Sequence, residues 1–454
     1  MSQPAAPTTD DAMRARVMRK VAWRLSPFLG LLYFINYLDR SNIGFAAPHG
    51  MNEALGFDSS AYGLASGLFF IGYLILEVPS NLALHRFGAR RWIARIMVSW
   101  GIVASLMAFV PNAGSMYALR FLLGIAEAGF FPGIILYLTY WFPKRQRAKA
   151  VALFMVAVPL SSVIGSPLSA WLISSGHRVL FDLDGWRFMF LIEGIPAIVI
   201  GVLCWFYLTD RPHQARWLAE DERDWLQREM DTEHEQTARR YHVPLRKSLT
   251  QPRIWALAFV YFGIVYGLYA VGFFLPTIIA GFSETFDTNF SILQQGLIVA
   301  IPYAFGCVAM VLWSRHGDRT RERVWHVALP AIIGGIAIPI ALYLGSPFTT
   351  MIAVTVCTMG ICAALPTFWP LPTMFLSGAA AAAGIALINS IGNTAGFLGP
   401  YITGWLTDWT GTEKLGLWVV GIVMVAAGVV AVALRAAPAP DDEDAVESDL
   451  AGHA

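Results

Sequence analysis

The sequence has 454 residues, of which 56% are hydrophobic and only 14% are charged, and its formal net charge at pH 7 is +1. Soluble domains carry about 25% charged residues. This composition, with a mean hydropathy of +0.55, therefore excludes an ordinary water-soluble globule and indicates a membrane protein. The balanced charge gives no reason to expect a nucleic-acid partner. The four cysteines lie in apolar segments without metal-ligand or redox spacing, so we expect no disulfide framework, no metal site and no cofactor.

Twelve apolar segments are long enough to cross a bilayer, which takes about 20 mostly apolar residues in a helix. They cover residues 23–47, 59–81, 89–110, 115–141, 148–174, 187–208, 253–281, 290–313, 323–344, 348–375, 381–406 and 415–435. The first segment is too long for a signal-peptide core and lacks a small-residue cleavage site, so we expect it to be retained. The fold class that follows is an all-α membrane protein with twelve transmembrane helices.

A long charged segment divides the twelve helices into two groups of six. Within it, large apolar residues recur at near-helical spacing among charges, which predicts an amphipathic surface helix. These residues are Trp217, Leu218, Trp225 and Leu226. A solvated linker helix without a further role fits the same pattern. The expected organisation is a cytoplasmic tail, a six-helix bundle, a cytoplasmic linker, a second six-helix bundle and a disordered acidic tail, over residues 1–22, 23–208, 209–252, 253–435 and 436–454.

Lysine and arginine gather in alternate connections between the apolar segments, and this asymmetry sets the orientation of a membrane protein. The basic connections hold Arg14, Arg16, Arg19, Lys20 and Arg24 before the first segment, Arg86, Arg90 and Arg91 after the second, Lys144, Arg145, Arg147 and Lys149 after the fourth, and Arg315, Arg319, Arg321 and Arg323 after the eighth. The opposite loops hold only Arg178, Arg187 and Lys414. The pattern predicts a multi-pass protein of a plasma membrane, such as the bacterial inner membrane, with both termini in the cytoplasm.

The two groups of six helices share short matches that indicate an internal repeat. Ala152 and Trp171 in the fifth segment recur as Ala386 and Trp405 in the eleventh, at one common offset along the chain. Chance matches of common membrane residues are the alternative. Parallel six-helix repeats related by an axis along the membrane normal are typical of secondary transporters whose site lies between the halves.

The first apolar segment contains the stretch Asn36-Tyr37-Leu38-Asp39-Arg40. Ionisable side chains within a transmembrane helix are costly, face the protein interior or a water-filled cavity, and often mark a substrate or ion path. A guanidinium stays charged and presents a planar fork that fits a carboxylate. Arg40 is therefore the leading candidate to bind an organic anion, and a structural ion pair between helices is the alternative.

The fourth segment carries a second pair of ionisable residues, Arg120 and Glu127, which are two helical turns apart and share a face. At 1.5 Å per residue, Asp39 and Arg120 both lie roughly 10 Å below the outer membrane surface, so the two could pair. Glu127 lies nearer the midplane, with no basic residue close to it in sequence. A carboxyl that exchanges protons there suits a proton-coupled carrier, so Glu127 is a candidate proton-coupling residue. A Glu127 that only hydrogen-bonds between helices is the alternative.

The second half carries neutral polar residues deep in its apolar segments instead of charged ones. Those we expect to contact substrate are Tyr266 and Tyr269 in the seventh segment and Asn389 and Asn393 in the eleventh. The two asparagines are four residues apart and share a helix face. Packing of the tyrosines and helix-to-helix hydrogen bonding by the asparagines are the alternatives.

Several of these runs together resemble the major facilitator superfamily, and within it the anion:cation symporter family of tartrate, phthalate, hydroxyphenylacetate and sugar-acid permeases. The runs are Asn36 to Arg40, Arg86 to Arg91, Arg120 to Pro132 and Gly384 to Asn393. The resemblance covers nearly the whole chain apart from its tails. One departure is His85, which stands where the superfamily loop usually has an aspartate, whereas Asp318 keeps that residue in the second half.

The resemblance implies roles for the residues in these runs. Asp39 and Glu127 would be the proton-coupling carboxylates, and Arg40 would hold the substrate carboxylate. Arg120 would tune the carboxylates, while Tyr37 and Asn393 would lie on the substrate side.

We therefore expect a secondary active transporter that acts as a monomer and imports a small organic carboxylate by proton symport with alternating access. An organic anion exchanger without proton coupling is the closest alternative. A membrane enzyme is disfavoured because the sequence has no phosphate-binding loop, no HExxH and no GxSxG motif. A channel would differ by conducting without saturation. The expected partners are the anion, protons and the lipid bilayer.

Overall fold

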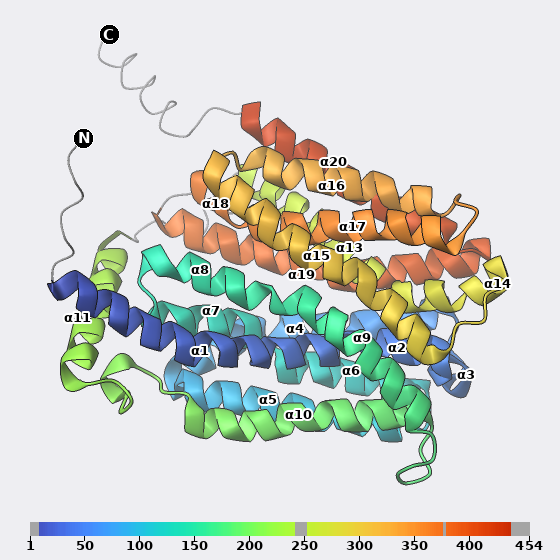
Figure 1. The fold of residues 1–454 in the computed structure, drawn as a ribbon, viewed down its shortest axis with the longest axis horizontal. Helices are drawn as coiled ribbons and strands as arrows, with labels where there is room; N and C mark the ends of the chain where they lie inside the picture. Colours follow the sequence, from blue (N-terminus) through green and yellow to red (C-terminus); the bar gives the residue numbers. More distant parts are fainter. Residues whose placement is uncertain (1–8, 241–251, 376–377, 437–454) are drawn as a thin grey trace.

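The computed structural model describes residues 9–240, 252–375 and 378–436, and within these ranges the chain is helical without β-strands. The expected acidic tail beyond residue 436 and the first eight residues lie outside the described residues. The helices run side by side in two groups, with the N-terminal half (blue to green) below the C-terminal half (yellow to red) in Figure 1.

Every expected apolar segment corresponds to a helix or to an interrupted pair of helices. The continuous ones are α4 (Ser59–Phe87), α5 (Ala89–Leu106), α10 (Gly185–Tyr207), α13 (Pro252–Ala280), α15 (Ile292–Thr320), α16 (Val324–Ala341), α19 (Gly378–Thr410) and α20 (Lys414–Ala433). The interrupted ones are α1 (Thr9–Ser41) with α2 (Ile43–Ala46), α6 (Ala113–Glu127) with α7 (Phe130–Trp141), α8 (Lys144–Met155) with α9 (Ala157–Ser175), and α17 (Pro347–Phe368) with α18 (Pro370–Phe375). Short helices α3 (Met51–Leu55) and α14 (Phe282–Phe286) lie in the connections at one end.

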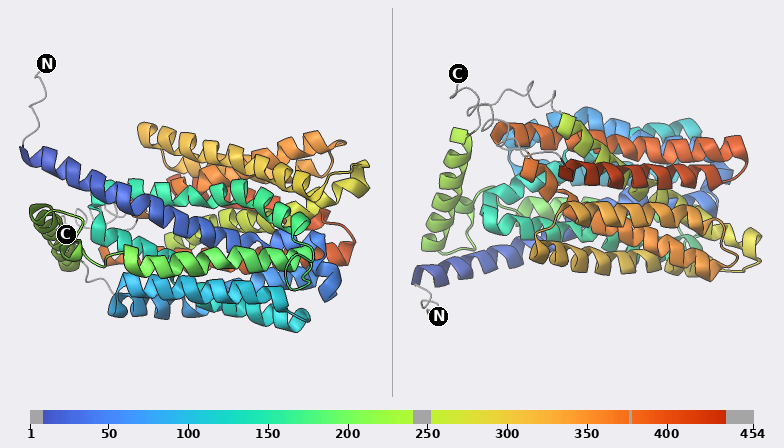
Figure 2. Two further views of the ribbon diagram at one scale, coloured as in Figure 1. Left: turned by 60° about the horizontal axis from the view of Figure 1, so that its bottom comes forward. Right: turned by 90° about the horizontal axis from the view of Figure 1, so that it is seen from above.

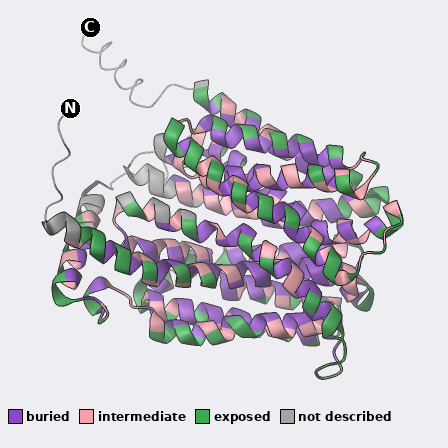
Figure 3. Cartoon of the chain, in the orientation of Figure 1, coloured by how far each residue is buried: buried purple, intermediate pink, exposed green. Residues whose placement is uncertain are grey.

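Among the described residues, 10 helical segments are long and apolar enough to cross a membrane by length and composition. The two expected segments outside this set are α1, whose apolar part carries Arg24, Asp39 and Arg40, and α19. Large apolar side chains cover the outer faces of the bundle, for example Phe206, Leu312 and Phe348, which are 78%, 59% and 76% exposed. Figure 3 shows the exposed residues on the outward helix faces and the buried ones between the helices. Such apolar surface is unfavourable in water and suits contact with lipid.

The halves touch mainly along α4 with α19 and along α9 with α15, and α2 also contacts α13. At the end of the bundle opposite α11 the backbones approach so closely that a side chain at Gly404 of α19 would place its Cβ 2.0 Å from the Ser59 carbonyl oxygen. The Asp408 carboxylate beside it accepts hydrogen bonds from the backbone amides of Ser59 and Ser60, at 3.1 and 2.7 Å. The two halves are therefore closed against each other at this end.

The first helix extends further than the sequence indicated. Residues 9–22, assigned above to a cytoplasmic tail, are the first turns of α1. Val17 and Val21, one turn apart, are fully buried, and Lys20 forms an ion pair with Glu222 at 2.7 Å. These contacts give the extension a packed face, which the composition of the tail alone did not indicate.

The linker forms helix α11 (Glu220–Arg240), which runs across the end of the N-terminal half in Figure 2. Leu226 and Met230 are buried on its inner face, 0% and 4% exposed. Trp217 and Leu218 lie in the turn before the helix, where the Trp217 ring stacks on Trp141 of α7 with 5.5 Å between centroids. The amphipathic helix is thus present but begins later than the apolar spacing suggested, and the linker residues 241–251 lie outside the described residues.

Candidate functional site

Arg40 lies in the last turn of α1, at the boundary between the two halves, and is only 7% exposed. Its guanidinium forms an ion pair with the Glu127 carboxylate of α6, in its own half. It also donates a hydrogen bond of 2.8 Å to the Tyr269 hydroxyl of α13, in the other half. The rings of Phe69 and Tyr73 on α4 lie beside the guanidinium, 4.8 and 5.5 Å from it. One cationic group therefore joins an acidic residue of the first half to a neutral residue of the second.

The local chain geometry explains why Glu127 faces Arg40. Helix α6 ends at Glu127, and Gly129 just after it has a left-handed backbone (φ 82°) that suits glycine. A Cβ at Gly129 would meet the Ser80 Oγ atom of α4 at 2.4 Å, so the chain turns here in close contact with α4. Gly124, one turn before, likewise packs directly on the backbone of Phe69. This close α4–α6 contact brings the end of α6, and with it Glu127, to the end of α1.

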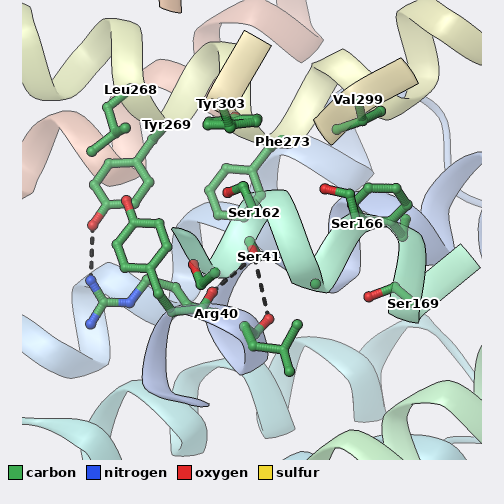
Figure 4. A pocket seen from close by; sticks show the side chains of 16 residues that line it. Arg40, Ser41, Ser162, Ser166, Ser169, Leu268, Tyr269, Phe273, Val299 and Tyr303 are labelled. Atoms are coloured by element: carbon green, nitrogen blue, oxygen red, sulfur yellow. Dashed lines mark hydrogen bonds between the residues drawn. The ribbon is translucent and has the colours of Figure 1, made fainter. Parts of the chain in front are cut away.

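Two pockets adjoin Arg40, and Tyr37, Leu268 and Tyr269 line both of them together with it. The pocket on the α11 side, here called the aromatic lobe, is also lined by Tyr33, Tyr73, Phe131, Met155, Val158, Tyr261, Val265, Leu365, Asn389 and Asn393. The pocket on the opposite side, here called the serine lobe, is also lined by Leu38, Ser41, Phe45, Ser161, Ser162, Gly165, Ser166, Ser169, Gly272, Phe273, Val299 and Tyr303. Figure 4 shows the serine lobe with the serines of α9 below Phe273 and Tyr303 of the second half. Both lobes thus lie between the halves.

The structure brings most of the expected substrate-side residues together. Arg40, Tyr37, Tyr269, Asn389 and Asn393 all line the aromatic lobe. The Asn389 amide also donates a hydrogen bond of 2.8 Å to the Glu77 carboxylate of α4, across the boundary between the halves.

Two expected site residues, Arg120 and Tyr266, line neither lobe. Arg120 is fully buried and donates to the backbone carbonyls of Ala65 and Ser66 on α4, at 3.2 and 3.3 Å, so it stabilises the α4–α6 contact. Tyr266 is 1% exposed and lines neither lobe. Tyr266 and Tyr269 are three residues apart, but only Tyr269 points at Arg40.

The pairing expected from helix depth is wrong. Asp39 is fully buried and accepts a hydrogen bond of 2.9 Å from the Trp100 indole of α5, without an ion pair to Arg120. Glu127, expected to lack a basic partner, pairs with Arg40. Successive residues on a helix point about 100° apart, so Asp39 faces into its own bundle while Arg40 faces the boundary. The depth of a residue along its helix predicts its position across the membrane, but it does not predict the direction in which its side chain points.

Glu77 and two tyrosines of the aromatic lobe, Tyr33 and Tyr73, were not among the expected site residues. Glu77 is 6% exposed and lies inside the second apolar segment, where an acid is a signal of function. Tyr33 precedes Tyr37 by one helical turn, and Tyr73 precedes Glu77 by one turn. Residues four apart share a helix face, so a search for further polar residues one turn from Tyr37 and from Glu77 would have found both tyrosines.

Comparison with known proteins adds the family. A family model described as Major Facilitator Superfamily matches residues 29–400 and 285–451. The chain belongs to the Major Facilitator Superfamily. It is therefore a multi-pass membrane transporter and not an enzyme.

Similar proteins cover nearly the full length of this superfamily member. A protein of Agrobacterium vitis named "Putative tartrate transporter" is 52% identical over 427 residues, 94% of this chain and 96% of its own. A Pseudomonas putida protein named "Putative metabolite transport protein NicT" is 41% identical over 92% of this chain and 94% of its own. The "Inner membrane transport protein RhmT" of Escherichia coli is 36% identical over 97% of this chain and 99% of its own. These relatives agree with the resemblance to anion:cation symporter permeases.

Solved structures support the fold. The xylose transporter XylE of E. coli, in a partially occluded inward open conformation, superposes with a TM-score of 0.72 at 16% identity, covering 93% of this chain and 99% of its own. A bacterial homologue of the human lysosomal transporter Spinster superposes with a TM-score of 0.66 at 17% identity, covering 90% and 94%.

Proposed function

We propose that this transporter imports a small organic carboxylate together with protons. The observation that carries the proposal is the position of Arg40, whose guanidinium faces both lobes while it pairs with Glu127. A guanidinium is the side chain best suited to hold a carboxylate by two parallel hydrogen bonds. In this structure Glu127 occupies part of that fork.

The pairing supplies a mechanism for coupling. Protonation of Glu127 removes the charge that holds Arg40, and the guanidinium is then available to a substrate carboxylate. Loss of the proton restores the Arg40–Glu127 pair and displaces the substrate. Because a proton and an anion are taken up together and released together, the energy of a proton gradient can drive accumulation of the anion.

Alternating access follows from the two halves. The end opposite α11 is closed by the contacts of Gly404 with Ser59 and of Asp408 with Ser60. We place this end on the outside of a bacterial inner membrane and both termini in the cytoplasm, as the distribution of basic residues predicts. Rocking of the two six-helix bundles, residues 23–208 and 253–435, would open each end in turn around Arg40.

Substrate size and polarity follow from the lobes. The hydroxyls of Tyr33, Tyr73 and Tyr261 and the amides of Asn389 and Asn393 surround the aromatic lobe, and these groups can hydrogen-bond to hydroxyls or a second carboxylate. A tartrate-like acid or a sugar acid fits such a site, and the name of the Agrobacterium vitis relative supports this class. The aromatic rings would also accept an aromatic acid.

The test is uptake of a labelled organic acid into proteoliposomes. With an inward proton gradient and no internal anion, the wild-type protein should accumulate the acid, and Arg40→Ala should abolish uptake. Accumulation that requires an internal counter-anion and ignores the proton gradient would establish the exchanger instead.

A further inference from the structure

A groove runs along the outer face of the N-terminal half between α1 and α10, which contact each other. Figure 2 (left) shows the two helices side by side, α1 in blue and α10 in green. The groove has a volume of about 590 Å³, and its walls are the apolar side chains of Pro27, Phe28 and Leu31 from α1 and of Ile200, Leu203 and Phe206 from α10. Leu31, Leu203 and Phe206 are 42%, 49% and 78% exposed, so the groove opens toward the lipid.

Arg24 stands at one end of this groove and is the one charged residue among the described residues that line it. Its guanidinium lies over the rings of Tyr207 and Trp217, 4.5 and 5.0 Å from their centroids. The Tyr207 hydroxyl donates a hydrogen bond of 2.9 Å to the backbone carbonyl of Arg24. Trp23, which also lines the groove, is 76% exposed. Tryptophan and tyrosine concentrate at the membrane–water interface, so Arg24 lies at the level of the lipid headgroups.

The charge of Arg24 is not balanced by an acid of the chain. Arg16, Lys20 and Arg24 follow one another at intervals of four residues and share a helix face. Glu222 of α11 pairs with Arg16 at 3.3 Å and with Lys20 at 2.7 Å. Arg24 forms no ion pair within the described ranges, and its Nε atom is buried there without a hydrogen-bond partner. The guanidinium is therefore available to an anion from outside the chain.

The groove has the polarity and direction of a lipid. Arg24 and Leu31 are seven residues apart, which places them about 10 Å from each other along α1. The apolar walls thus lead from the headgroup level toward the middle of the membrane, through about two thirds of the roughly 15 Å of hydrocarbon in one leaflet. A phospholipid likewise presents a phosphate at the surface and apolar chains below it. Basic pockets between helices on the cytoplasmic side, where we place the α11 end of the bundle, suit anionic headgroups.

The opposite side of α1 offers a comparison. A second groove, of about 500 Å³, lies between α1 and the helices α8 and α9. It is lined by apolar side chains such as Phe34, Leu153 and Leu160, with Ser26 as a polar one and without a charged side chain among the described residues. The two grooves therefore differ in the cation at the end of the first, and only the first can select a headgroup by its charge.

We propose that the groove between α1 and α10 binds one anionic phospholipid. Its phosphate binds to Arg24, and one of its acyl chains lies along Leu31 and Leu203. Because Arg24 also stacks on Trp217, the bound lipid connects α1 and α10 to the turn before α11. The inference needs a chain that spans the membrane and does not depend on the proposed substrate or on proton coupling.

Native mass spectrometry tests the proposal on the full-length protein in micelles that contain equal amounts of phosphatidylglycerol and phosphatidylcholine with the same acyl chains. The wild-type protein should retain one phosphatidylglycerol in preference to phosphatidylcholine. Arg24→Gln should weaken the binding of phosphatidylglycerol about fivefold and lose the preference, because one basic residue near the membrane surface contributes about that factor. Arg24→Lys keeps the charge and should keep the preference. Glycerol phosphate, which has the headgroup charge without the chains, should not compete.

Leu203→Trp fills the groove and leaves Arg24 in place, so it should also lose the bound lipid and serves as a second variant if Arg24→Gln does not fold. Leu160→Trp, in the groove without a cation, is its control. Arg95→Gln controls for the loss of an arginine, because Arg95 stacks on Trp92 at 4.1 Å but lines neither groove. Both controls should behave as wild type. Equal retention of the two lipids by the wild-type protein would show ordinary surrounding lipid only and overturn the proposal. Competition by glycerol phosphate, or an unchanged preference in Arg24→Gln or Leu203→Trp, would overturn it as well.

Discussion

The Arg40 guanidinium and the Tyr269 hydroxyl are joined by a hydrogen bond of 2.8 Å that crosses the boundary between the two halves of the transporter. Arg40 belongs to α1 and Tyr269 to α13, which occupy corresponding positions as the first helix of each half. The bond therefore joins the cation that we propose to bind the substrate to the second half of the transporter.

Removal of this hydroxyl should weaken substrate binding. A hydrogen bond to a charged group contributes about 1.5–3 kcal/mol, so Tyr269→Phe should raise the dissociation constant of the substrate about tenfold or more. Tyr266→Phe is a matched control, because Tyr266 lies on the same helix but lines neither lobe. Titration calorimetry on purified protein measures the dissociation constant of the substrate for both variants. Equal effects of the two variants would show that Arg40 does not depend on Tyr269.

Close backbone contact at Gly404 should hold the end opposite α11 closed. An added methyl group in Gly404→Ala meets the Ser59 carbonyl at 2.0 Å and should force the halves apart there. A cysteine at Val299 in the serine lobe, in a chain whose native cysteines are replaced by serine, should then react several times faster with a maleimide. Gly345→Ala is the control, because a Cβ at Gly345 meets nothing within 4 Å. Unchanged labelling in Gly404→Ala would show that this contact does not close the transporter.

The bond between Asn389 and Glu77 should stabilise the fold across the two halves. Asn389→Ala leaves the Glu77 carboxyl, which is 6% exposed, without this partner. Loss of a partner by a buried polar group costs about 1–3 kcal/mol, so the unfolding temperature in detergent should fall by a few degrees. The double variant Asn389→Ala with Glu77→Leu also removes the unpaired carboxyl. It should therefore recover part of the lost unfolding temperature. An additive loss in the double variant would contradict a direct interaction.

Docking of α11 should depend on pH through Glu222. Burial alone would raise the pKa of this carboxyl, but the hydrogen bonds from Lys20 and the Ala219 amide and the charge of Arg16 outweigh it, so its pKa lies below the ordinary value. The ion pair therefore stabilises the folded state fully above the unfolded pKa of about 4.3, and this stabilisation is lost as the pH falls from there through the lower pKa of the folded state.

Tryptophan fluorescence reports this loss, because Trp217 and Trp225 lie at the contact. The emission should change on acidification below about pH 4 in the wild-type protein. Glu222→Gln should show the acid form already at neutral pH, whereas Glu229→Gln, at an exposed position on the same helix, should behave as wild type. A transition that persists in Glu222→Gln would assign it to another group.

The sequence allowed the fold to be predicted closely, because twelve apolar segments and the basic residues between them are local signals. It also located Arg40, Tyr37, Tyr269, Asn389 and Asn393 at the boundary, since polar groups in apolar helices have few other places to lie. The prediction failed where it needed the rotation of one helix against another. The partners of Asp39 and Glu127 depend on that rotation. The depth of a residue along its helix gives no information about it.

The extension of α1 illustrates a second limit. Its residues 9–22 are polar enough to suggest a tail, yet Val17 and Val21 are buried and Lys20 pairs with Glu222 of the distant helix α11. Contacts between segments about two hundred residues apart cannot be obtained from the local pattern of either segment.

The measurement that tests the account most directly is transport by Glu127→Gln, whose neutral amide imitates the protonated acid. Arg40 should then stay available, so the variant should bind substrate at least as tightly as wild type and with little dependence on pH. It should exchange labelled for unlabelled substrate across the membrane but fail to accumulate it against a gradient when protons are supplied. Accumulation equal to that of the wild-type protein would contradict the competition between Glu127 and substrate for Arg40.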